Sequence, residues 1–264
     1  MELESLGIVI LLLLVVLLFS PIGLGGGLLY VPVLHYLAGL PFETAILGSL
    51  VLVLSTAIGS AQAHRTERMV SSTNVKAALW TALPGAAAGA MTSLWVIERV
   101  SDVSVKILVM GLTAWILLQA IRKMRAEAQA IVGEFDLVPY RLGSGVGGFS
   151  CGMLGIGGGA IYVTMNRGWG GLDVHQAAGT SFMIAAWVVP IAVATHLIAG
   201  GPGELASFDP LVLLATPLLA VAVAFFGGRF AARHMPVNVI TWIFITVVSL
   251  GLLRYAVDLS NMFI

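Results

Sequence analysis

The stretch GLGGGLLYV at residues 23–31 returns as GIGGGAIYV at residues 155–163, and each copy interrupts a long apolar run. The copies begin 132 residues apart (155 minus 23), which is half of the 264-residue chain. Glycine is a poor helix former, so four glycines in five residues should break a helix and leave peptide groups unpaired. Lipid cannot satisfy those groups, so each break must be buried in protein or line a cavity. In secondary transporters, interruptions at matching positions of two halves mark the substrate site.

The composition is that of a membrane protein. Hydrophobic residues make up 59% of the chain and charged residues 10%, and the mean hydropathy is +1.01, whereas soluble domains carry about 25% charged residues. We therefore expect a multi-pass membrane protein. Its net charge of zero argues against a nucleic acid partner. The lone Cys151 excludes an intramolecular disulfide and a cysteine metal cage, and we expect neither a metal nor a cofactor.

The apolar runs predict an all-α polytopic protein built from two four-segment repeats. The expected segments are 6–37 (interrupted at 21–27), 43–63, 77–97, 103–121, 138–166 (interrupted at 155–159), 174–199, 209–228 and 237–257. Adding 132 to the first four starts gives 138, 175, 209 and 235, close to the starts of the last four. We expect a first transmembrane repeat at 1–121, a polar cytoplasmic linker at 122–137 and a second repeat at 138–264.

Two topologies are open for the interrupted segments. If each spans once, eight of the 13 Lys and Arg residues share one side of the membrane, whereas re-entrant hairpins place ten of the 13 there. A hairpin leaves three full spans in each half, and this odd number inverts the second repeat relative to the first. The charge bias therefore favours inverted repeats. Each hairpin arm has about 13 residues, or on the order of 20 Å of helix, which reaches past the middle of the bilayer core.

The glycines divide into two groups. Scattered glycines such as Gly85, Gly89, Gly143 and Gly147 are best explained by close helix packing. The paired clusters exceed what packing needs, and the helix that starts after each break offers free N–H groups and a positive dipole end to an anion. The substrate-binding candidates on these clusters are Gly23, Gly25, Gly26, Gly27, Gly155, Gly157, Gly158 and Gly159.

Several neutral polar side chains are further candidates for the anion site. Ser49, Thr180, Ser181 and Asn166 carry hydroxyl or amide groups that donate hydrogen bonds to oxyanion oxygens. Hydrogen bonding between helices explains the same residues equally well. Ionisable residues, in contrast, fall near segment ends, which weakens a mechanism based on a carboxylate relay.

His64 and His196 occupy equivalent positions at the 132-residue offset, near the ends of their segments. Histidine titrates near neutral pH, so this pair is the candidate for proton coupling. The competing explanation, which we favour, is a pair of interfacial residues that reach toward water. No segment carries a catalytic or metal-binding constellation, so we do not expect an enzyme.

The chain resembles the TauE/SafE family over nearly its full length. The resemblance rests on the paired GxGGG clusters, on residues 45–50 (AILGSL) echoed by 177–182 (AAGTSF), and on 228–236 (GRFAARHMP). The first repeat departs from this pattern, because residues 89–93 (GAMTS) lack the basic run found near residue 229. The resemblance implies a plasma-membrane permease for small sulfur-containing anions, with export of sulfite and sulfoacetate as the named activities.

These observations predict a secondary transporter, most simply an exporter, that moves sulfite or a sulfonate by alternating access. An anion channel, or a proton- or sodium-coupled importer of a sulfur oxyanion or other small organic anion, remains open. A membrane-embedded enzyme or assembly factor is the distant alternative. The expected partners are a small anionic substrate and the lipid bilayer, and a homodimer is left open.

Overall fold

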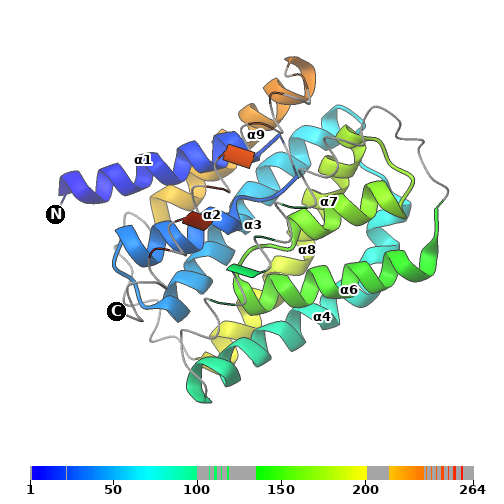
Figure 1. Ribbon diagram of the computed structural model, residues 1–264. Helices are drawn as coiled ribbons and strands as arrows, with labels where there is room; N and C mark the ends of the chain where they lie inside the picture. Colours follow the sequence, from blue (N-terminus) through cyan, green and yellow to red (C-terminus); the bar gives the residue numbers. More distant parts are fainter. Residues whose placement is uncertain are drawn as a thin grey trace.

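The computed structural model describes residues 2–21, 23–99, 135–200, 214–234 and 236, with single residues between 107 and 118 and between 239 and 257. The described part is helical and contains no strand (Figure 1). Its elements are α1 (Glu2–Phe19), α2 (Gly27–Pro32), the π-helical turn η1 (Val33–Leu37), α3 (Phe42–Thr66), α4 (Ser72–Arg99), α6 (Leu137–Leu154), α7 (Gly159–Gly168), α8 (Val174–Gly200) and α9 (Thr216–His234). The predicted segments 103–121 and 237–257 and residues 122–134 of the predicted linker (122–137) lie outside the described residues, apart from those single positions.

Two of the described helices, α3 and α8, have the length and apolar character needed to cross a membrane. Shorter apolar helices cover residues 6–19, 27–37 and 216–230. The all-helical fold class is thus confirmed for the described residues.

Both glycine clusters interrupt helices, as predicted. α1 ends at Phe19 and α2 begins at Gly27, whereas α6 ends at Leu154 and α7 begins at Gly159. On the 132-residue offset, α6 runs three residues further than α1, since 154 minus 132 is 22. The first half carries Pro21 where the second carries Met153, and proline disfavours helix at the residue before it.

α6 and α7 form a helical hairpin. The N–H of Asp136, just before α6, donates to the carbonyl oxygen of Trp169, just after α7, at 2.9 Å. The Tyr140 hydroxyl of α6 donates to Asn166 Oδ1 of α7 at 2.6 Å. Figure 1 shows α6 and α7 extending from their break toward one side of the molecule and α1 and α2 toward the opposite side. The two breaks therefore face each other in the middle.

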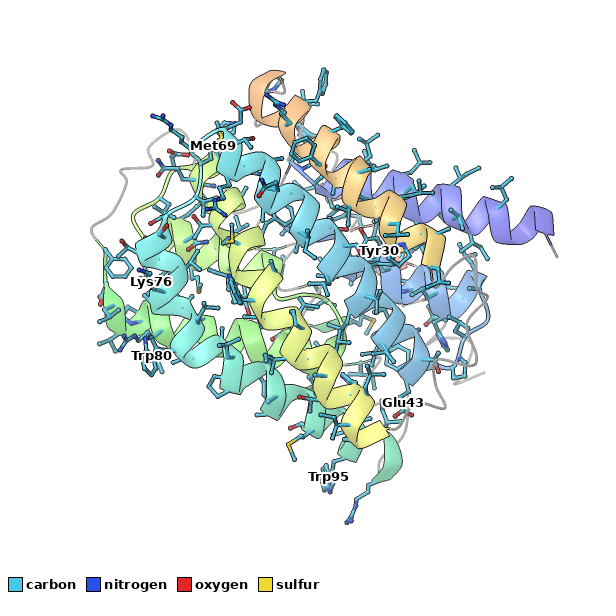
Figure 2. The ribbon with its side chains drawn as sticks, turned by 180° about the vertical axis from the view of Figure 1, so that it is seen from behind. Tyr30, Glu43, Met69, Lys76, Trp80 and Trp95 are labelled. Carbon is cyan, nitrogen blue, oxygen red and sulfur yellow. The ribbon has the colours of Figure 1, made fainter. Side chains whose placement is uncertain are left out.

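The last described helix of each half packs on the other half. α3 and α8 contact each other; α4 packs on α6 and α8, and α9 packs on α1 and α3. α3 and α4 are antiparallel: Figure 2 places Met69 and Lys76 toward one end of this pair and Glu43 and Trp95 toward the other. The two breaks lie against α3 and α8: a Cβ on Gly155 would meet Ile46 of α3, and one on Gly23 would meet Ala178 of α8.

Small residues allow the close contact between α4 and α6. A Cβ atom added at Gly89 would collide with the Phe149 carbonyl oxygen, and one added at Gly148 would collide with that of Ala82. A Cβ at Gly85 would lie 2.5 Å from the Gly145 carbonyl oxygen. Within the second half, a Cβ at Gly147 would strike the Tyr162 ring. The packing interpretation of the scattered glycines is therefore confirmed.

Candidate functional site

The two glycine clusters share one unusual backbone conformation. Each has left-handed φ angles at its first, third and fourth positions and a glycine that opens a helix at its fifth. The angles are +86° at Gly23 and +69° at Gly155, +72° at Gly25 and +76° at Gly157, and +78° at Gly26 and +64° at Gly158. A residue with a Cβ pays roughly 1–2 kcal/mol for this conformation. The repeated glycines are therefore explained by backbone geometry at three positions in each half.

The clusters lie in direct contact. A Cβ built on Gly27 would lie 2.5–2.6 Å from backbone atoms of Ile156, and one on Gly159 would lie 2.7 Å from backbone atoms of Leu24. Gly27 and Gly159 are equivalent at the 132-residue offset, as are Leu24 and Ile156, so the two contacts are reciprocal. A larger residue at position 27 or 159 would push the clusters apart.

Two serines join the clusters across the halves in the same reciprocal way. Ser49 Oγ on α3 donates to the Gly155 carbonyl oxygen at 2.7 Å. Its equivalent, Ser181 Oγ on α8, lies 2.7 Å from the Gly23 carbonyl oxygen and 3.1 Å from that of Gly159. Each hydroxyl has a single proton, which these carbonyl oxygens already engage. Both serines thus fix the positions of the clusters, and their hydroxyls satisfy carbonyl oxygens at the breaks.

The helices that leave the two breaks begin without side-chain caps. Gly26 and Gly158 are the N-cap residues, and neither makes a side-chain cap hydrogen bond. The Leu29 and Tyr30 N–H groups donate to the Gly26 carbonyl oxygen, and the Tyr162 N–H donates to that of Gly158. Within the described residues, no acceptor is recorded for the first N–H groups of either helix, at 27–28 and 159–161. Two positive helix ends therefore meet with unpaired donors.

Protein encloses this junction. Every residue from 23 to 32 and from 150 to 162 is buried. Val53 of α3 is fully buried and lies against both clusters: its Cγ1 would sit 3.2 Å from a Cβ on Gly25 and would collide with one on Gly157. Its equivalent on α8 is the smaller Ala185. Sequence reasoning missed Val53, because a valine in an apolar helix carries no local signal.

Each cluster also packs against the tyrosine that follows it. A Cβ on Gly26 would lie 2.6 Å from the Tyr30 hydroxyl, and one on Gly158 would lie 3.0 Å from the Tyr162 ring. The Tyr30 hydroxyl hydrogen-bonds Thr56 Oγ1 at 2.9 Å. The Tyr162 hydroxyl is buried and has no partner among the described residues, since the equivalent of Thr56 is Val188. The repeated Tyr-Val after each cluster was the available signal for these residues.

The hydrogen bonds of the Asn166 and Thr180 side chains go to residues outside the two glycine clusters. Asn166 accepts a hydrogen bond from Tyr140 and donates to the Ala177 carbonyl oxygen at 3.2 Å. Thr180 Oγ1 accepts from the Ser71 N–H at 3.0 Å. Both side chains therefore connect elements of the scaffold, which matches the alternative of hydrogen bonding between helices.

His64 and His196 are only 1% exposed, so the interpretation of interfacial side chains reaching toward water is wrong. His64 Nδ1 lies 2.8 Å from the Ser60 carbonyl oxygen within its own helix. His196 Nε2 lies 2.8 Å from the carbonyl oxygen of Gly152, in the last turn of α6 before the break. His196 Nδ1 is buried without a partner among the described residues. Because a carbonyl oxygen only accepts, the nitrogen facing it carries the proton in each ring.

The comparisons with known proteins agree with the sequence resemblance. The family model for sulfite exporter TauE/SafE matches residues 8–255. No curated protein and no solved structure matches the chain. The match covers nearly the whole sequence, including both glycine clusters and the helices that hold them, and the chain belongs to the TauE/SafE family of sulfite exporter-type membrane transporters.

Proposed function

We propose that this protein carries a small sulfur oxyanion, sulfite or a sulfonate, out of the cell by alternating access around the junction of the two glycine clusters. The observation that carries the proposal is the meeting of two uncapped helix N-termini, those of α2 and α7, inside the protein. The contact residues are the eight cluster glycines. The N–H groups of Gly27 and Gly159, at the two helix starts, have no acceptor within the described residues, whereas the Gly155 N–H donates to the Cys151 carbonyl oxygen at 3.1 Å.

Electrostatics makes this junction attractive to an anion. Each helix start carries roughly half a positive charge, so two such ends in contact repel each other where solvent is excluded. A bound anion converts that repulsion into attraction and takes up the unpaired N–H groups. The serine hydroxyls donate hydrogen bonds to the carbonyl oxygens of Gly23 and Gly155. These partly negative oxygens therefore repel an anion less.

The reciprocal contacts support two inverted four-segment repeats. Contacts in one half have equivalents in the other at the 132-residue offset. This holds for the contacts between cluster residues, for the serine hydrogen bonds, and for the packing of α4 and α9 on the opposite half. The breaks approach each other from opposite sides of the molecule (Figure 1). The junction is enclosed in the described conformation. Alternating access therefore requires an opening motion, in which the cluster between α1 and α2 and the cluster between α6 and α7 would separate from Val53 in turn.

Export needs no coupled ion. The cell interior is electrically negative, so a leaving monovalent anion gains about 2.3 kcal/mol per 100 mV. Uptake would require a proton or sodium partner, and His196 beside the break would then be the first candidate for proton coupling. The enclosed junction favours a carrier over an open channel.

The test is efflux of labelled sulfite from liposomes that contain the purified full chain. Ser49→Ala with Ser181→Ala should slow efflux at least about thirtyfold, because each change exposes a cluster carbonyl oxygen at a typical cost of 1–3 kcal/mol and every 1.36 kcal/mol is about a factor of ten in rate. Ser55→Ala is the matched control, since Ser55 lies on α3 and its Oγ donates to the Val51 carbonyl oxygen of its own helix.

Ser55→Ala should keep wild-type efflux. Wild-type rates in the double serine variant, measured with equal amounts of inserted protein, would rule out the junction as the substrate site. Efflux that depends linearly on sulfite concentration without saturation would favour the channel.

A further inference from the structure

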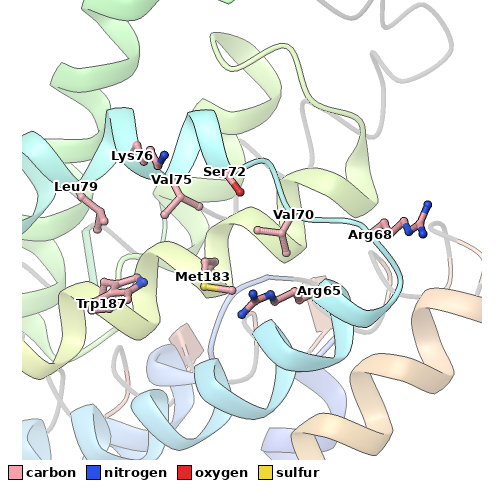
Figure 3. Close-up of a pocket in the computed structure, with 9 residues that line it drawn as sticks. All are labelled: Arg65, Arg68, Val70, Ser72, Val75, Lys76, Leu79, Met183 and Trp187. Carbon is pink, nitrogen blue, oxygen red and sulfur yellow. The ribbon is translucent and has the colours of Figure 1, made fainter.

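A cavity lies away from the glycine junction, where α3 ends and α4 begins beside α8 (Figure 3). Its volume is about 390 Å³. Arg65 comes from the last turn of α3 and Arg68 from the turn that follows it, Ser72 and Lys76 come from the start of α4, and Met183 and Trp187 from α8. Figure 3 shows the Arg65 side chain extending toward Met183, with Lys76 on the α4 side and the Arg68 guanidinium directed outward at the mouth. Three helices thus contribute to one open cavity.

Arg65, Arg68 and Lys76 give the cavity three positive charges. Within the described residues, no ion pair is recorded for Arg65, Arg68 or Lys76. The nearby acid, Glu67, pairs instead with Arg229 of α9 at 3.2 Å. The mouth is therefore a concentrated positive site at the end of a membrane protein.

An apolar trough continues from the cations. An adjoining cavity of about 560 Å³ shares Lys76 and Leu79 and adds Trp80, Leu83 and Pro84. These positions recur every three to four residues, so they form one face of α4 that leads away from its charged start. Trp80 is 76% exposed and Trp187 60% exposed, as expected of aromatic side chains at a membrane surface.

Arg68, at the mouth of the cavity, occupies a backbone position that ordinarily belongs to glycine. The Met69 N–H donates to the His64 carbonyl oxygen and the Arg68 N–H to that of Arg65, which is the Schellman pattern at a helix end. Arg68 has a φ of +59° and is the one non-glycine residue with positive φ in the described part of the chain. A charged side chain thus stands at the mouth in a conformation that glycine would adopt without strain.

We propose that this cavity binds an anionic phospholipid, with its phosphate between Arg65 and Lys76 and an acyl chain along Leu79, Leu83 and Pro84. Charge complementarity selects the anionic headgroup. The apolar trough distinguishes a lipid from a free phosphate or sulfur anion, which would leave that trough unfilled. The site is separate from the glycine junction and does not depend on the transported substrate.

The test measures thermal unfolding of the purified full chain in neutral detergent with dioleoyl phosphatidylglycerol, dioleoyl phosphatidylcholine or glycerol phosphate. Phosphatidylglycerol at one hundred times its Kd should raise Tm by about 5 °C, and the other two should not. Arg65→Gln with Lys76→Gln should abolish most of this shift. Arg99→Gln is the matched control, because Arg99 lies at the far end of α4, over the Trp95 ring.

Equal shifts with both lipids would overturn the proposal, and so would an equal shift with glycerol phosphate, which would indicate a site for free anions. Loss of the shift in Arg99→Gln would indicate diffuse charge attraction instead. A second readout uses no charge variant: dibrominated phosphatidylglycerol should quench a larger share of the fluorescence in the wild type than in Trp187→Phe. Equal quenching of the two proteins would also overturn the proposal.

Discussion

Ser49 and Ser181 illustrate how a residue's role depends on its acceptor. As buried hydroxyls at equivalent positions they suit either an oxyanion or a neighbouring helix. Their protons in fact point at carbonyl oxygens of the opposite half's glycine cluster. The positions of the two helix breaks were predictable from their glycines, because few other residue types tolerate such backbone angles. The serine acceptors were not, because they lie 106 and 158 residues away along the chain.

Arg68 carries a prediction at this same scale. Arg68→Gly should stabilise the protein by about 1 kcal/mol, because glycine adopts φ of +59° without steric cost. The expected rise in Tm is about 2–4 °C in neutral detergent without added anionic lipid.

Gln62→Gly serves as the control, because Gln62 is an exposed residue in the regular part of α3. This variant should lower Tm, since glycine inside a helix is less favourable than glutamine by about 0.5–1 kcal/mol. A Tm for Arg68→Gly at or below that of the wild type would contradict the strain assigned to Arg68.

At the scale of elements, the contact between α4 and α6 depends on glycines that look alike in sequence but differ in surroundings. A Cβ on Gly148 would collide with the Ala82 carbonyl oxygen, whereas one on Gly145 would lie 3.5 Å from Thr81 Cβ, an ordinary contact. Periodic small residues therefore predict that a helix packs closely. They do not reveal which glycine meets backbone and which meets a side chain.

Two alanine substitutions one turn apart test this difference. Gly148→Ala should destabilise the protein by about 1–3 kcal/mol, because the helices must separate. Gly145→Ala should be neutral or stabilising by up to about 1 kcal/mol, since alanine favours helix. Thermal unfolding of the two purified variants gives the comparison, and an equal loss of stability in both would contradict this difference in packing.

At the scale of the whole molecule, the halves are interlocked. α4 of the first half packs on α6 and α8, and α9 of the second packs on α1 and α3. The repeat at the 132-residue offset indicated equivalent segments, and the charge count favoured hairpins entering from opposite faces. The α6–α7 hairpin is now seen in the bond between Asp136 and Trp169. The interlocking lay beyond sequence reasoning, because it depends on packing between segments distant in the chain.

Inverted hairpins make a prediction about accessibility. Leu37 and Gly168 are both exposed at the outer ends of α2–η1 and α7. Leu37→Cys and Gly168→Cys, each combined with Cys151→Ala, should react with an impermeant thiol reagent from opposite faces of the membrane, with position 168 on the cytoplasmic side. Labelling of both from one face would contradict inverted repeats.

The amino-acid order alone specified the membrane class, the two helix breaks and their equivalence, because hydropathy, helix propensity and repetition act locally along the chain. It also carried the family resemblance that the match over residues 8–255 confirms. Folding added what no local pattern contains: the contact of the two clusters, the crossed serine bonds, the burial of both histidines and the cationic cavity beside α8. Each of these joins residues from separate helices, so each depends on how those helices pack.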